Sequence, residues 1–149
     1  MTVQIPVSVI YLVRHAEKVS DYDENSELSP QGHARARRLA ALLRDQAIDR
    51  VYVTALERTL QTAAPLIAIH QPEVRTLSAS PAFLTAAAQE LTALPDGTHT
   101  LVVTHVQYLA PTLALLGVPV VDLRVDGFDH LFVIHRVGTR ANLLRLRYA

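Results

Sequence analysis

The sequence predicts a three-layer α/β/α fold, built on a mostly parallel sheet that has an antiparallel edge at the C-terminus. Short apolar runs rich in β-branched residues alternate along the chain with longer segments in which apolar residues recur at helical spacing. Near the C-terminus this alternation gives way to two successive β-like runs. A chain of 149 residues has the length of one domain, which we expect to span residues 1–149.

The first apolar run, residues 9–13, ends abruptly in Arg14 and His15. A continuous apolar run of this kind is typical of a strand that is buried on both faces. Arg14 and His15 then lie at the carboxyl end of the strand, where open α/β sheets bind their ligands. A guanidinium offers a planar fork of donors to phosphate oxygens, and a neutral imidazole can act as a nucleophile. The pair therefore indicates a site for phosphoryl transfer.

A polar loop over residues 18–28 separates this strand from the first helix. Ser29 is a good N-cap and Pro30 suits the first helical position. Apolar residues then recur at helical spacing, which predicts a helix up to about Asp45. The arginines of this helix are expected on its solvent-facing side: Arg35, Arg37, Arg38 and Arg44.

The second strand is expected at residues 48–53, and the second helix from near Glu57, past Pro65, towards His70. Thr54 is a candidate N-cap of this helix. Arg58 then lies in the first helical turn, near the positive end of the helix dipole, where anions bind.

The remaining chain continues the alternation and ends in a hairpin. We expect a short strand at residues 74–77, a helix at 83–94, a strand at 100–104 that ends in His105, and a helix at 107–116. Two β-like runs, 130–135 and 142–148, flank the turn-like residues 137–139 and predict an antiparallel hairpin at one edge of the sheet.

Three strand ends carry chemically useful side chains that are distant in the sequence. The first carries Arg14 and His15, the second is followed by Thr54 and Arg58, and the third ends in His105. The carboxyl ends of parallel strands lie at one edge of a sheet, so these residues can converge on one pocket. Two arginines and two histidines around one point would neutralise a phosphoryl group and stabilise the charge of its transition state.

The composition excludes several other classes of function. Lys+Arg and Asp+Glu number 14 each, a balance that argues against binding to nucleic acid or to a membrane surface. The chain has no cysteine, which excludes disulfides, thiolate catalysis and cysteine-ligated metals. We find no signal-peptide pattern and no apolar run long enough to span a bilayer, so we expect a cytoplasmic protein.

A metal site is a further hypothesis, suggested by the seven histidines of the chain. His130 and His135 lie five residues apart, which does not put both side chains on one face of a strand. The sequence has no Asp, Glu or His motif with recognised ligand spacing. His33, His70 and His99 are expected on surface elements. We therefore expect no metal.

The chain resembles the histidine phosphatase superfamily, whose fold is that of phosphoglycerate mutase. The matching segments are LVRHAEK at residues 12–18, LSPQG at 28–32, RTLQTA at 58–63 and LVVTH at 101–105. They occur in the family's order with similar spacing, and the resemblance extends over residues 9–117, with residues 128–134 similar to the final strand of short members. The short branch that reads Arg-His-Ala-Glu resembles protein-phosphohistidine phosphatases.

The resemblance implies a role for four matching residues. His15 would be the nucleophile that accepts the phosphoryl group, and Arg14, Arg58 and His105 would hold the phosphate oxygens. From its place after the second strand, we also expect Thr54 to contribute to substrate binding. Water would then hydrolyse the phosphohistidine, so no cofactor is implied. Three positions depart from the family pattern: Ala16, Ala55 and Val106.

A larger departure concerns the general acid. Many family members carry a carboxylate after the second arginine, but residues 77–88 contain none, and Glu90 comes too late in the sequence to match. Glu17 is a candidate substitute because it is close to His15, but a structural or solvated role explains it equally well. Asp21 and Asp23, in the following loop, are weaker candidates.

The missing acid affects the expected substrate. Protonation of an alkoxide leaving group contributes roughly 10²–10⁴-fold to the rate, whereas a phosphoramidate or an acidic phosphate leaves more easily. We therefore expect a phosphatase that acts on a phosphorylated small molecule or a phosphohistidine-bearing protein. The alternative is a catalytically weak member that binds phosphorylated ligands or a protein partner.

Overall fold

The computed structural model describes residues 5–149; residues 1–4, the start of the N-terminal segment that lacks a signal-peptide pattern, lie outside the described residues. Six strands and four helices are seen in the described chain. In order they are β1 (Ser8–Arg14), α1 (Pro30–Leu42), β2 (Arg50–Thr54), α2 (Glu57–His70), β3 (Glu73–Leu77), α3 (Ala82–Thr92), β4 (His99–Thr104), α4 (Val106–Leu115), β5 (His130–Val137) and β6 (Arg140–Arg147).

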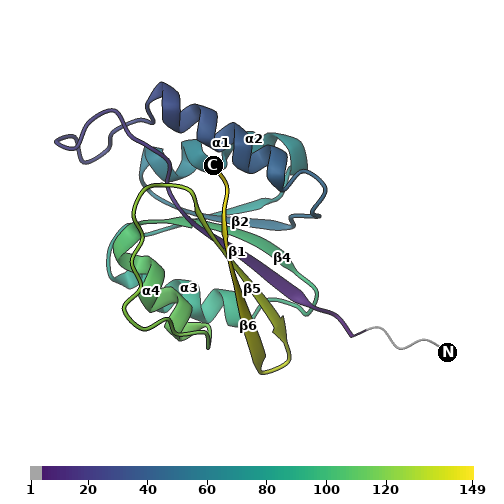
Figure 1. Cartoon of the computed structure of the whole chain (residues 1–149). Helices are drawn as coiled ribbons and strands as arrows, with labels where there is room; N and C mark the ends of the chain where they lie inside the picture. Colours follow the sequence, from purple (N-terminus) through teal and green to yellow (C-terminus); the bar gives the residue numbers. More distant parts are fainter. Residues whose placement is uncertain (1–4) are drawn as a thin grey trace.

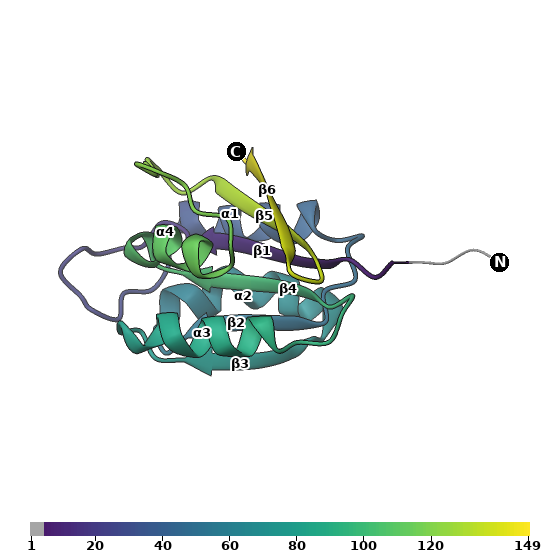
Figure 2. The same ribbon diagram turned by 90° about the horizontal axis from the view of Figure 1, so that it is seen from below.

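The strands form one sheet in the order β3-β2-β4-β1-β5-β6. The pairs β3–β2, β2–β4 and β4–β1 are parallel, whereas β5 runs antiparallel to both β1 and β6. Helices α1 and α2 cover one face of the sheet, and α3 and α4 cover the other (Figures 1 and 2). This arrangement confirms the predicted three-layer α/β/α fold, with its antiparallel C-terminal hairpin at one edge.

The central strand β1 shows why its sequence is apolar throughout. Val9, Tyr11 and Val13 belong to the core on the α1–α2 side of the sheet. Ile10 and Leu12 belong to the core on the other side, with residues of α3 and α4. Because successive side chains of a strand point to opposite faces, a strand between two helical layers needs an unbroken apolar run.

The predicted elements all form, but several of their ends lie elsewhere. The first helix ends at Leu42 rather than near Asp45. Thr54 is not the N-cap of α2: it is the last residue of β2, and Leu56 precedes the helix in extended backbone without a side-chain cap. The Thr54 hydroxyl instead bonds to residues of the site described below.

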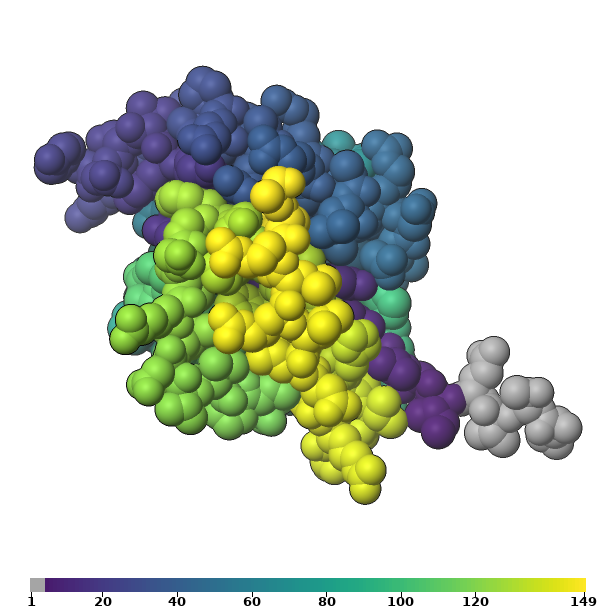
Figure 3. All heavy atoms as spheres, viewed as in Figure 1, coloured from purple at the N-terminus to yellow at the C-terminus, as the bar shows by residue number. Residues whose placement is uncertain are grey.

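One loop stands away from the layered body of the protein. Residues 19–27 form the loop that follows the carboxyl end of β1 (Figure 1) and projects from the surface in the space-filling view (Figure 3), and most of them are exposed. No helix within residues 5–149 is long and apolar enough to cross a membrane.

Candidate active site

Two parallel strands bring His15 and His105 together. Arg14 at the end of β1 pairs in register with Thr104 at the end of β4. The backbone N–H of His15 donates to the Thr104 carbonyl at 2.9 Å, which continues the ladder one residue further. The centroids of the two imidazole rings are 5.5 Å apart, and both residues are buried. The predicted convergence of these two strand ends is therefore confirmed.

The hydrogen bond of His15 determines which of its nitrogens can react. Nδ1 lies 2.7 Å from the Ala16 carbonyl oxygen. A carbonyl can only accept, so Nδ1 carries the proton and Nε2 keeps its lone pair. Burial lowers the pKa of His15 to about 3, with smaller contributions from the charges of Arg58 and Arg14, and the Ala16 bond opposes this shift. His15 is thus neutral near pH 7, the form that can attack phosphorus.

A buried pair of threonine hydroxyls holds the second histidine. Nε2 of His105 lies 2.9 Å from Oγ1 of Thr54, which lies 3.1 Å from Oγ1 of Thr59. Burial lowers the pKa of His105 to about 4, helped by the charges of Arg58, Lys18 and Arg14. Thr54 therefore reaches the site through His105. The sequence pattern does not identify Thr59 as a residue of the site.

The two arginines are positioned by backbone carbonyls and an aromatic ring. Nη1 of Arg14 donates to the Gly127 carbonyl at 3.0 Å, and its guanidinium lies 4.1 Å from the centre of the Phe128 ring. Nη1 of Arg58 donates to the Glu24 carbonyl at 2.8 Å. The Nε atom of each arginine is buried and has no hydrogen-bond partner within residues 5–149. Both side chains thus keep donor capacity for an anionic ligand.

Phe128 extends the site to the C-terminal part of the chain. Its ring centroid is 6.0 Å from that of His15, and the ring also stacks on Arg14. No local pattern in the sequence identifies Phe128 as a site residue, because its contacts depend on how the segment before β5 returns across the sheet.

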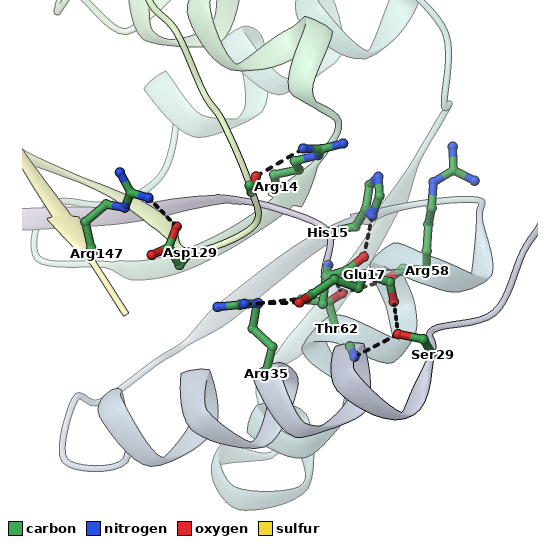
Figure 4. A network of polar contacts seen from close by, with 12 residues as sticks. Arg14, His15, Glu17, Ser29, Arg35, Arg58, Thr62, Asp129 and Arg147 are labelled. Atoms are coloured by element: carbon green, nitrogen blue, oxygen red, sulfur yellow. Dashed lines mark hydrogen bonds and ion pairs between the residues drawn. The ribbon is translucent and has the colours of Figure 1, made fainter. Parts of the chain in front are cut away.

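Glu17 is engaged by Arg35 rather than directed at His15 (Figure 4). Its two carboxylate oxygens accept hydrogen bonds from Nε and Nη2 of Arg35 at 2.7 and 3.0 Å. Burial acts to raise the pKa of Glu17, but the bonds and charge of Arg35 outweigh it, and the pKa falls below its usual value. An ionised carboxylate cannot donate a proton, which favours the structural role for Glu17.

The expectation for Arg35 was wrong. Its side chain is only 12% exposed, because the first helix packs against the loop that carries Glu17. Gly32 permits this approach, since a Cβ atom built there would overlap the Glu17 carbonyl oxygen. The predicted N-cap is confirmed at the same place: Oγ of Ser29 accepts from the Gly32 N–H at 3.1 Å.

The other candidate acids lie apart from the histidines. Asp21 and Asp23 are exposed in the loop after β1. Glu90 on α3 forms a bidentate ion pair with Arg75 on β3, at 2.8 and 2.9 Å. The charges that shift the pKa values of His15 and His105 include no carboxylate from the described part of the chain.

The histidines do not gather with carboxylates into a metal-binding group. Across residues 5–149, no cluster of three or more His, Cys, Asp or Glu side chains could hold a metal ion. His130 is buried, with Nε2 3.0 Å from the Asp126 carbonyl oxygen, whereas His135 is exposed.

Comparisons with known proteins agree with this geometry. Residues 10–79 match the histidine phosphatase superfamily (branch 1); this segment includes Arg14, His15 and Arg58, while His105 lies beyond it. No curated protein matches the sequence.

Several solved structures share the fold over nearly the whole chain. The protein histidine phosphatase SixA, solved with tungstate, is 17% identical, with a TM-score of 0.74 over 93% of this chain and 96% of that one. A mycobacterial glucosyl-3-phosphoglycerate phosphatase is 17% identical, with a TM-score of 0.75 over 96% and 100%. Phosphoglycerate mutase from Bacillus anthracis is 13% identical, with a TM-score of 0.76 over 95% and 93%.

At these identities the structural likeness shows the fold, which is that of phosphoglycerate mutase, as expected. The sequence match over residues 10–79 and the shared fold together confirm the resemblance of this chain to the histidine phosphatase superfamily.

Proposed function

We propose that this protein hydrolyses a phosphorylated substrate by transferring the phosphoryl group to Nε2 of His15. The observation that carries the proposal is a neutral, buried His15 whose Nδ1 proton is bound to the Ala16 carbonyl, beside Arg14, Arg58 and His105. An imidazole in this state has its reactive lone pair on Nε2 without prior loss of a proton.

The proposed reaction has two phosphoryl-transfer steps. The substrate phosphate binds to Arg14, Arg58 and His105, whose donors neutralise its charge. Nε2 of His15 then forms a bond to phosphorus while the bond to the leaving group breaks. A water molecule attacks the phosphohistidine, inorganic phosphate leaves, and the water's remaining proton passes to solvent. No cofactor enters this scheme.

The absence of a nearby carboxylate in the described chain determines the substrates we propose. An alkoxide leaving group needs a proton donor, and Glu17 is held ionised by Arg35. A phosphoramidate nitrogen can take its proton from solvent before the P–N bond breaks. We therefore favour phosphohistidine-bearing proteins, or small molecules with an acidic leaving group. The name of the similar SixA structure, a protein histidine phosphatase, supports this choice.

The leaving-group dependence of the rate tests the proposal. We expect a higher kcat/KM for a phosphohistidine peptide than for a phosphoserine peptide of the same sequence, and a steep fall in kcat/KM across aryl phosphates of rising leaving-group pKa. A kcat/KM independent of the leaving group would contradict the proposed lack of an acid. His15→Asn serves as the inactive control, and Arg37→Ala, which alters an exposed arginine of α1, serves as the active one.

The alternative, a protein that binds phosphate without turnover, is not favoured. The site brings together the same four residues that the family resemblance implies: Arg14, His15, Arg58 and His105. Tight vanadate binding, with no release of phosphate from the phosphopeptides or the aryl phosphates, would support this alternative instead.

A further inference from the structure

The peptide group that holds the His15 proton is itself held by a helix. The Ala16 carbonyl accepts from Nδ1 of His15 at 2.7 Å, and the Ala16 N–H donates to Oγ1 of Thr62 at 2.9 Å. Thr62 belongs to α2, and Figure 4 shows its side chain below His15, between the catalytic loop and the helix. Ala16 and Thr62 are both fully buried, so water cannot replace this bond.

The donor and the acceptor of each hydrogen bond made by the Thr62 hydroxyl can be assigned. Oγ1 of Thr62 lies 2.7 Å from the Arg58 carbonyl oxygen, which can only accept, so the hydroxyl proton is directed to it. The Ala16 N–H can only donate, so it uses a lone pair of the same hydroxyl. The Thr62 hydroxyl therefore serves the loop that follows His15 and the helical turn that carries Arg58 at the same time.

We infer that Thr62 is a positioning residue for the phosphoryl transfer: its hydroxyl orients the Ala16 peptide so that the Ala16 carbonyl keeps the His15 proton on Nδ1 and leaves Nε2 free. The inference rests on the proposed function. It assigns a task to the second threonine of the RTLQTA segment, which the phosphate-binding scheme does not use. Loss of the hydroxyl would leave the Ala16 N–H buried without a partner and release the peptide from its orientation.

Replacing Thr62 by a residue of similar shape tests the inference. Thr62→Val removes the hydroxyl and keeps the volume, and Thr62→Ala removes it without adding bulk. We expect either variant to lower kcat by about 10- to 100-fold, while KM and the Kd for vanadate change less than about threefold. Thr62→Ser should restore kcat to within about threefold of the wild-type value. The control is Thr112→Val, since Thr112 is a buried threonine of α4 whose hydroxyl has no partner within residues 5–149.

The imidazole tautomer provides a readout that does not depend on turnover. Nitrogen-15 NMR of the wild-type protein should show His15 protonated on Nδ1, and Thr62→Val should show a mixture with the Nε2-protonated form. An unchanged tautomer with an unchanged kcat, accompanied only by a lower Tm, would overturn the inference. If the wild-type protein forms no phosphohistidine, the proposed function fails, but the tautomer measurement still decides the role of Thr62.

Discussion

Acidification should destabilise this protein through the two buried histidines. His15 and His105 have folded-state pKa values of about 3 and about 4, against 6.5 for an unperturbed imidazole. Between pH 6.5 and pH 4 the unfolded chain therefore binds protons that the folded chain does not. Stability from these groups is present above pH 6.5 and is lost as the pH falls.

The size of this effect follows from the difference in pKa. Between pH 7 and pH 5, each histidine should lower the free energy of unfolding by about 2 kcal/mol, and the pair by about 4 kcal/mol. This is a large fraction of the roughly 5–15 kcal/mol that stabilises a typical domain. Few carboxylates titrate between pH 7 and pH 5, so the loss of stability in this range comes mainly from histidines.

Chemical denaturation in a phosphate-free buffer measures the loss. The wild-type protein and the double variant His15→Asn/His105→Asn are each unfolded with urea at pH 7 and pH 5. The comparison removes the contribution of the other histidines, because both proteins contain them. We expect the wild type to lose about 4 kcal/mol more than the double variant. Equal losses would refute the conclusion that both rings are held neutral by the fold.

Three further substitutions test separate parts of the site. Arg58→Ala should weaken vanadate binding about 10- to 100-fold by removing a charged donor, measured by calorimetry against the exposed control Arg37→Ala; unchanged affinity would show that Arg58 does not face the anion. Gly32→Ala should lower the free energy of unfolding by about 1–3 kcal/mol, because its Cβ would overlap the Glu17 carbonyl, whereas the ordinary helix preference for alanine would raise it. Glu17→Gln should lower stability by about 2 kcal/mol through the Arg35 pair and leave the leaving-group dependence of kcat unchanged; a selective loss of rate on poor leaving groups would make Glu17 the acid.

The fold was predictable because its signals are local. An unbroken apolar run such as residues 9–13 identifies a strand between two helical layers, and the β5–β6 hairpin follows from two such runs around a turn. The convergence of His15 and His105 was predictable for a related reason, since the ends of parallel strands share one edge of a sheet.

Other features depend on contacts between distant segments. Arg35 has the helical position of a solvated charge, and only the close packing allowed by Gly32 brings it onto Glu17. Thr54 has the composition of an N-cap, but the fold places it against His105, 51 residues away. Phe128 reaches Arg14 only through the path of the segment before β5. The RTLQTA segment was a usable signal for Thr62, but sequence alone does not indicate which of its side chains contacts the catalytic loop.

If His15 carries the phosphoryl group, rapid-quench labelling should detect the phosphorylated protein itself. The protein would be mixed with an activated aryl phosphate bearing phosphorus-32, quenched at millisecond times, and digested for peptide mapping. We expect a stoichiometric burst, with an acid-labile, base-stable label on the peptide that contains His15, and no label in His15→Asn. A protein that hydrolyses the substrate without forming this label, or that carries the label on another residue, would contradict this role of His15.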